Sequence, residues 1–170
     1  MHRFIYEAED EAATAALGAA LNGLLPDGTT VALCGTLGSG KTRLVQAIAE
    51  ASGVDRRDVV SPTFVIIQEH RGRRPVYHFD AYRLHDEDEF LQLGPEEYFD
   101  GEGLTLVEWA DHVPNCLPAD RIEIHIEVTG PGSRRFEVVD LGRHHTAIIK
   151  GLHDWAARRT SPGGPAPFAR

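Results

Sequence analysis

The chain has 170 residues, of which 42% are hydrophobic and 25% are charged, and its formal net charge at pH 7 is −9. These values are ordinary for a soluble globular protein with a single domain and a buried core. The acidic balance argues against a surface that mainly binds nucleic acid, and the apolar runs are far shorter than the roughly 20 residues of a membrane span, so we expect no membrane contact.

The start of the chain and its cysteines indicate the compartment. Residues 1–12 turn acidic at once and lack the apolar stretch of a signal peptide. Cys34 and Cys116 do not have the spacing of a metal or redox motif, and we interpret Cys34 as a small core residue. We therefore expect a cytoplasmic, reduced protein.

The first third of the chain predicts a strand–loop–helix unit. Residues 9–25 carry apolar side chains at helical spacing, and Pro26 ends that helix. Residues 30–34 are typical of a buried strand, and residues 41–51 are helix-prone. Between them, residues 35–42 read Gly-Thr-Leu-Gly-Ser-Gly-Lys-Thr, which fits the phosphate-binding loop pattern at every fixed position.

The chemistry of such a loop predicts a bound nucleoside triphosphate. Its glycines let the backbone amides point at phosphate oxygens, and the helix that follows adds its positive N-terminal end. Lys41 would reach the β- and γ-phosphates, and Thr42 would offer its hydroxyl to Mg²⁺. The alternative interpretation is a glycine-rich turn before a helix. The predicted phosphate-contacting residues are Gly35, Leu37, Gly38, Ser39, Gly40, Lys41 and Thr42.

The remaining segments predict a mixed sheet. They are a hairpin at 64–80, a helix at 83–93, a strand at 104–107 that runs into Glu108, a second hairpin at 121–140, a helix at 147–155 and a disordered tail at 158–170. With a phosphate loop near the start, this pattern predicts one α/β domain over residues 1–157. Its sheet would be mostly parallel, with antiparallel additions from the two hairpins.

A phosphate loop needs an acidic partner for Mg²⁺, and two carboxylates stand where such a partner is expected. Glu108 and Asp80 each end an apolar strand, and either one could hold the metal directly or through water. The alternative for each is a surface carboxylate. The hydroxyl-rich segment Ser61-Pro62-Thr63-Phe64 is either a nucleotide-sensing switch or a plain turn.

Two further side chains flank these carboxylates. His78 lies two residues from Asp80, so both side chains would share one face of a strand, and His78 either orients Asp80 or is a structural histidine. Trp109 follows Glu108 and either shields the site or packs in the core.

Taken together, these residues resemble the TsaE family, small P-loop ATPases of bacterial tRNA threonylcarbamoyladenosine biosynthesis. The resemblance covers residues 8–140. It rests on motifs in the family's order, which are Thr14-x-x-Leu17-Gly18, the loop 35–42, Ser61-Pro62-Thr63-Phe64, His78-Phe79-Asp80-Ala81-Tyr82-Arg83-Leu84, Gly94, Tyr98-Phe99 and Glu108-Trp109. The chain departs from the family pattern at Thr36, where an aspartate is usual, and also at Ser39 and Ala110.

The resemblance implies a P-loop fold with helices on both faces of the sheet and assigns roles to several residues. Lys41 and the loop amides would bind phosphates, and Thr42 and Glu108 would be the Mg²⁺ ligands. Asp80 would sit near the γ-phosphate and support hydrolysis. The expected contacts to the rest of the nucleotide come from Thr14, near the base, and from Arg135.

The resemblance also implies a function and its partners. The protein would be an ATP-hydrolysing accessory protein of the complex that modifies adenosine 37 of tRNA, acting with TsaD and TsaB and touching tRNA only indirectly. Two alternatives share the loop. One is a small-molecule kinase, which would need an acceptor pocket and an arginine-rich lid, and the other is a nucleotide-dependent switch with negligible hydrolysis.

Overall fold

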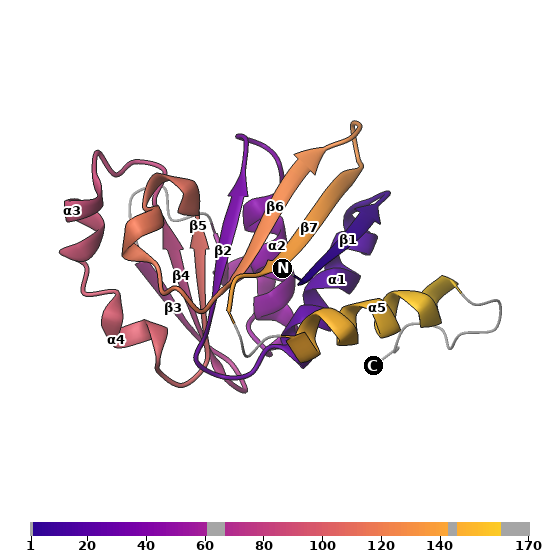
Figure 1. Cartoon of the computed structure of the whole chain (residues 1–170), viewed down its shortest axis with the longest axis horizontal. Helices are drawn as coiled ribbons and strands as arrows, with labels where there is room; N and C mark the ends of the chain where they lie inside the picture. The colour runs from indigo at the N-terminus through magenta and orange to yellow at the C-terminus, as the bar shows by residue number, and fades with distance from the viewer. Residues whose placement is uncertain (1, 61–66, 143–145, 161–170) are drawn as a thin grey trace.

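Seven strands within the described residues, which are 2–60, 67–142 and 146–160, form one sheet in this computed structural model (Figure 1). The strand order is β1-β7-β6-β2-β5-β4-β3. The strands are β1 (His2–Ala8), β2 (Thr29–Gly35), β3 (Ile67–Arg71), β4 (Pro75–Asp80), β5 (Leu104–Glu108), β6 (Ile122–Val128) and β7 (Arg134–Asp140). The helices are α1 (Glu11–Leu24), α2 (Lys41–Ala51), α3 (Glu87–Leu91), α4 (Glu96–Phe99) and α5 (Thr146–Thr160), and short 3₁₀ turns cover Arg56–Asp58, Ala110–His112 and Pro114–Cys116.

The sheet is parallel in its centre and antiparallel toward both edges. Strand β2 runs parallel to both β5 and β6, and β5 runs parallel to β4. The pairs β3–β4, β6–β7 and β1–β7 are antiparallel. This confirms the predicted α/β fold, and it shows that each hairpin supplies one strand to the parallel centre. Strand β1 was not predicted, because its partner β7 lies at the far end of the chain.

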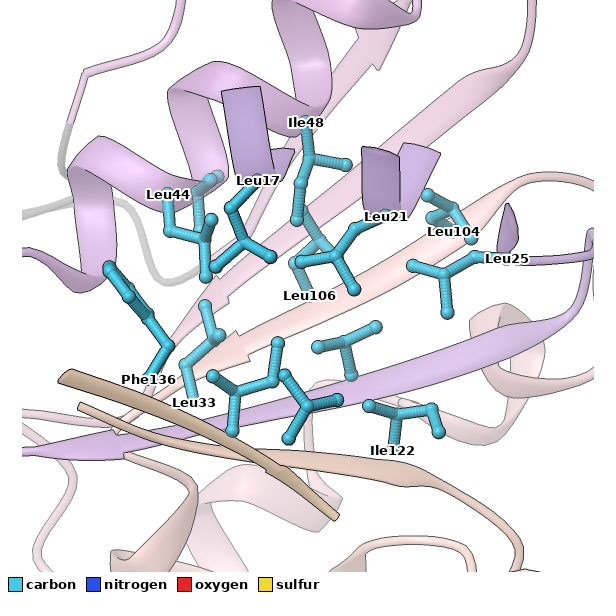
Figure 2. Packing of buried hydrophobic residues seen from close by; sticks show 14 of the residues in the cluster. Leu17, Leu21, Leu25, Leu33, Leu44, Ile48, Leu104, Leu106, Ile122 and Phe136 are labelled. Atoms are coloured by element: carbon cyan, nitrogen blue, oxygen red, sulfur yellow. The ribbon is translucent and has the colours of Figure 1, made fainter. Parts of the chain in front are cut away.

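Apolar side chains on both faces of β2 explain why this strand is central. Val31 and Leu33 face a large cluster, whereas Ala32 and Cys34 belong to a second cluster on the opposite face. Leucines of α1 and α2 pack onto β2 and β5 in the large cluster (Figure 2). Burial on both sides is typical of a parallel strand covered by two layers.

Helices cover the two faces unequally. Helices α1, α2 and α5 contribute to the large cluster, and α3, α4 and the two later 3₁₀ turns pack on the second cluster over β2, β4 and β5 (Figure 1). The expected helices on both faces are therefore confirmed. On the second face the other strands β6, β7 and β1 present polar side chains that include Arg3, Glu123, His125, Arg135 and Glu137.

Helix α1 lies against α2 at a close approach. Asp10 caps the start of α1 by accepting a hydrogen bond from the Ala13 amide at 2.7 Å. Leu17 and Leu21 are fully buried on the side that faces the sheet. Gly18 lies so close to Ala47 of α2 that a Cβ atom at Gly18 would collide with the Ala47 side chain.

Two predicted boundaries need correction. The helix expected at residues 83–93 is limited to α3, which begins after its capping residue Asp86. Helix α5 continues through Thr160, so residues 158–160 are helical and do not belong to a disordered tail. Two arginines in the last turn, Arg158 and Arg159, suit the negative end of the helix dipole. The rest of the expected tail lies outside the described residues.

Within the described part, none of the helices is long and apolar enough to cross a bilayer.

Candidate functional site

The phosphate loop joins the end of β2 to the start of α2, as predicted. Gly38 and Gly40 have φ values of +75° and +105°, a left-handed region that side chains rarely adopt, so these two positions require glycine. Gly35 is constrained by space, since a Cβ atom there would lie 2.6 Å from the carbonyl oxygen of Ile126. The loop is thus a tight curl that leads directly into the N-terminus of α2.

Lys41 lies inside this curl. Only 4% of the residue is exposed, and its Nζ donates hydrogen bonds to the carbonyl oxygens of Gly35 at 2.6 Å and Thr36 at 2.9 Å. Burial lowers the pKa of Lys41, and the negative charges of Glu108, Asp111 and Asp80 oppose that shift. Lys41 is therefore a desolvated cation that is held in place next to carboxylates.

Thr42, Glu108 and His78 form a hydrogen-bonded chain across three elements. The Thr42 hydroxyl donates to Glu108 Oε2 at 2.9 Å, and Glu108 Oε1 lies 2.8 Å from His78 Nε2. Glu108 and His78 are 2% and 0% exposed, so this carboxylate is buried and held on both oxygens. Of the two predicted carboxylates, Glu108 is thus the one that contacts the loop threonine.

His78 has a different partner from the one expected. It was predicted to orient Asp80, or to be structural, and its ring nitrogen contacts Glu108 instead. Strands β4 and β5 are parallel, and Asp80 pairs with Glu108 in their register. Side chains two residues apart share a face, so His78, Asp80 and Glu108 all point to the side that α2 covers. The histidine reaches the neighbouring strand, a contact that sequence spacing cannot reveal.

Asp80 and the loop line one cavity. Its volume is about 290 Å³, and its lining includes Lys41, Thr42, Asp80, Glu108 and Trp109. Asp80 is 8% exposed and accepts a hydrogen bond from the Tyr82 amide at 2.9 Å. The structure therefore brings the three predicted catalytic residues, Lys41, Asp80 and Glu108, to one place.

Trp109 covers the lysine of the loop. The Lys41 Nζ lies 3.5 Å from the centroid of the indole ring, which also contacts the tilted ring of Tyr82 with 4.7 Å between ring centroids. The backbone of Trp109 is left-handed, with φ at 58°, and a non-glycine residue in that region stores strain. Trp109 thus covers Lys41 and also packs against the second hydrophobic cluster. The predicted switch or turn at Ser61–Phe64 lies outside the described residues.

The arginine on the loop is Arg134. Its Nε donates to the Ser39 carbonyl at 2.8 Å and its Nη2 to the Gly38 carbonyl at 3.3 Å. Arg135 instead forms exposed ion pairs with Glu7 at 2.6 Å and Glu127 at 3.1 Å. Neighbouring residues of a strand point to opposite faces, and sequence reasoning missed Arg134 because the facing depends on the register of β7. The predicted nucleotide contact of Arg135 stays a prediction.

Thr14 lies on the other side of the loop. It is 4% exposed and lines a second cavity of about 230 Å³ with Gly40, Arg43, Arg134 and Phe136. This cavity adjoins the loop at Gly40, and the predicted contact of Thr14 with a nucleotide base stays a prediction.

The residues present fit a magnesium–nucleotide complex. Carboxylate and hydroxyl oxygens such as those of Glu108 and Thr42 are the ligands that Mg²⁺ prefers. The hydroxyl of Ser39 is buried without a hydrogen-bond partner among the described residues. This hydroxyl can therefore donate a hydrogen bond to a ligand of the loop, or accept one from it. Lys41 supplies the positive charge that a polyphosphate needs.

Both the sequence and the fold are similar to those of known proteins. The sequence model of a family described as threonylcarbamoyl adenosine biosynthesis protein TsaE matches residues 8–136. The tRNA threonylcarbamoyladenosine biosynthesis protein TsaE of Bacillus subtilis is 41% identical over 130 residues, which cover 75% of this chain and 80% of that protein. The protein of the same name from Treponema pallidum is 34% identical over 125 residues, covering 74% and 92%. The crystal structure of Bacillus subtilis YdiB superposes with a TM-score of 0.74 at 28% identity and covers 93% of this chain and 97% of that one.

Proposed function

The chain belongs to the TsaE family, and on that premise we propose that it binds and hydrolyses ATP with Mg²⁺ as an accessory protein of tRNA threonylcarbamoyladenosine biosynthesis. It would act in the cytoplasm together with TsaB and TsaD. The observation that carries the proposal is the chain of contacts from the loop to a buried carboxylate, Thr42 to Glu108 to His78.

The loop residues would bind and orient the phosphates. Lys41 is already positioned by the carbonyls of Gly35 and Thr36, so its ammonium needs no large rearrangement to meet an incoming phosphate. The glycine conformations at Gly38 and Gly40 keep backbone amides available for the same phosphates. Arg134 would hold the loop in this shape through its hydrogen bonds to the carbonyls of Ser39 and Gly38.

Thr42 and Glu108 would hold the magnesium ion. The hydroxyl proton of Thr42 is used by Glu108, which leaves the oxygen lone pairs of Thr42 free for a cation. His78 fixes the other oxygen of Glu108 and thereby its orientation. When bound, Mg²⁺ would neutralise charge on the phosphate oxygens.

Asp80 would act on the water that attacks the phosphate. It lines the same cavity as Lys41 and Glu108, and the Tyr82 amide holds one of its oxygens. A carboxylate in that place can accept a hydrogen bond from a water molecule and orient it. Trp109 would exclude bulk water from this side of the cavity.

The net charge of −9 suits a role through protein partners. Acidic chains are repelled by the phosphates of tRNA, so contact with tRNA would be left to the other components. The nucleotide is a smaller anion that would be bound at contact distance by Lys41, the loop amides and Mg²⁺. Salt screens exposed charges over about 8 Å, so the acidic groups that lie farther away would repel the nucleotide only weakly.

The proposal is tested by ATP hydrolysis with this protein alone and with purified TsaB and TsaD from the same source. We expect stimulation by the partners, and loss of most activity in Lys41→Ala and Glu108→Ala with folding retained in thermal melts. Glu102→Ala, an exposed glutamate just before the same strand, is the matched control and should keep full activity.

Two outcomes would contradict the proposal. Full activity in Glu108→Ala would contradict the assignment of Glu108 to the magnesium site. Intact ATP binding without partner stimulation would remove the accessory role, and a screen for phosphorylated metabolites would then test a kinase.

A further inference from the structure

We propose that Cys34, Glu123 and His125 form a second metal site, specific for a borderline transition metal such as Zn²⁺, on the face of the sheet opposite to the phosphate-binding cavity. One ligand atom from each residue lies within 4.8 Å of the others. This site does not depend on the proposed function and is separate from the pair Thr42 and Glu108.

The register of two parallel strands brings the three side chains together. Cys34 of β2 pairs with His125 of β6, and Glu123 lies two residues before His125 on the same face of that strand. His125 Nε2 is already 2.9 Å from Glu123 Oε1. Since the ligands come from strands about ninety residues apart, no short spacing motif announces them in the sequence.

The donor set selects the kind of metal. A thiolate, an imidazole and a carboxylate are the ligands of zinc sites, with metal–ligand distances of about 2.0–2.3 Å, so neighbouring donors in a tetrahedral site lie roughly 3.5 Å apart. Small side-chain rotations would bring atoms within 4.8 Å to that spacing. Magnesium and calcium are disfavoured, because both prefer oxygen donors and bind a soft sulfur poorly.

The surroundings support three ligands and leave room for a fourth. Arg121 Nη2 holds Glu123 Oε2 at 3.0 Å, which leaves Oε1 directed at His125. Cys34 and His125 line a cavity of about 370 Å³, so a water or another small ligand can complete the coordination. Three protein ligands with an open position are typical of a reactive rather than a purely structural zinc ion.

Burial of Cys34 makes its thiol harder to deprotonate, and metal binding must overcome this free-energy cost. The Cys34 residue is 8% exposed, and desolvation, followed by the charges of Glu123 and Asp111, raises the pKa of its thiol to about 12. The metal therefore displaces a proton from sulfur when it binds. The same two carboxylates contribute negative charge that attracts a divalent cation, and Arg121, which is hydrogen-bonded to Glu123, partly offsets it.

The site stands where the phosphate loop begins. Gly35, which accepts a hydrogen bond from Lys41, directly follows Cys34 and pairs with Ile126 next to His125. A metal at Cys34 and His125 would fasten the end of β2 to β6 at that point. Binding should therefore raise the melting temperature of the folded protein.

The test is a titration of the full chain with Co²⁺ in the absence of nucleotide, followed by displacement with Zn²⁺. We expect one equivalent of Co²⁺ with a sulfur-to-cobalt charge-transfer band, which oxygen ligands at Thr42 and Glu108 cannot produce. Cys34→Ser should lose the band, and His125→Ala should weaken binding at least tenfold. His125 is half exposed, so its variant is expected to fold.

Two matched variants serve as controls. Cys116→Ser removes the other cysteine, and His85→Ala removes an exposed histidine that contacts Glu89 much as His125 contacts Glu123. Both should keep the band, the affinity and the rise in melting temperature with Zn²⁺. A band that survives Cys34→Ser, an equal loss in Cys116→Ser, or no band at saturating Co²⁺ would overturn the site.

Discussion

His78 and Glu108 form a fully buried pair, in which the imidazole Nε2 lies 2.8 Å from the carboxylate Oε1. Because Thr42 holds the other oxygen, the histidine decides how the carboxylate faces the loop. Replacement by phenylalanine should raise the Mg²⁺ concentration needed for half-maximal ATP hydrolysis by about 10- to 100-fold. The Mg²⁺ dependence of the rate measures this.

A matched control is His85→Phe on the surface, which should leave the Mg²⁺ dependence unchanged. An unaltered Mg²⁺ dependence in His78→Phe would mean that the histidine does not position the carboxylate.

Two adjacent arginines are expected to behave differently. Arg134→Ala removes the charged donor to the carbonyls of Ser39 and Gly38 and should weaken ATP binding roughly 10- to 100-fold, since a charged hydrogen bond contributes about 1.5–3 kcal/mol. Arg135→Ala breaks only exposed ion pairs with Glu7 and Glu127 and should change affinity little. Calorimetric titration with ATP and Mg²⁺ separates the two, and a larger loss of affinity in Arg135→Ala would support the nucleotide contact that the sequence predicts for Arg135.

Two glycines of α1 give opposite expectations for stability. Gly18→Ala places a Cβ atom against Ala47 of α2 and should lower the free energy of unfolding by about 1–3 kcal/mol, as overpacking does. Gly23→Ala meets no atom within 4 Å and should raise it by roughly 0.5–1 kcal/mol through helix propensity. Urea unfolding measures both. Equal stabilisation in the two variants would show that α1 and α2 are not in close contact at Gly18.

His70 is expected to make the protein sensitive to mild acid. Burial, and then the charge of His78, lower its pKa from 6.5, while Asp58 opposes the shift. Below a pH of about 6.5 the unfolded chain binds a proton that the folded protein refuses, so the free energy of unfolding falls as the pH falls. In His70→Leu this slope should be smaller between pH 7 and pH 5.5, whereas exposed His85→Leu should leave it unchanged. Chemical unfolding at several pH values measures the slope, and an unchanged slope in His70→Leu would contradict the prediction.

Local patterns account for much of the fold and part of the site. The order of glycines, lysine and threonine in residues 35–42 predicts the loop, because residues other than glycine rarely adopt the positive φ values found at Gly38 and Gly40. Apolar periodicity predicts β2, α2 and both hairpins, since each element must bury one face or two. Strand β1 was not predicted, because this seven-residue segment is held in the sheet by pairing with β7, which lies more than 120 residues later in the chain.

The sequence by itself thus determined that a glycine-rich loop joins β2 to α2, and it predicts a nucleotide as the ligand of that loop. Only the tertiary structure decided which side chains meet. Thr42 reaches Glu108, His78 contacts Glu108, and Arg134 donates hydrogen bonds to the carbonyls of the loop. The register between β2 and β6 likewise places Cys34 beside His125. The physical reason is that facing alternates at every residue of a strand, so a contact between strands depends on pairing register, which no local pattern contains.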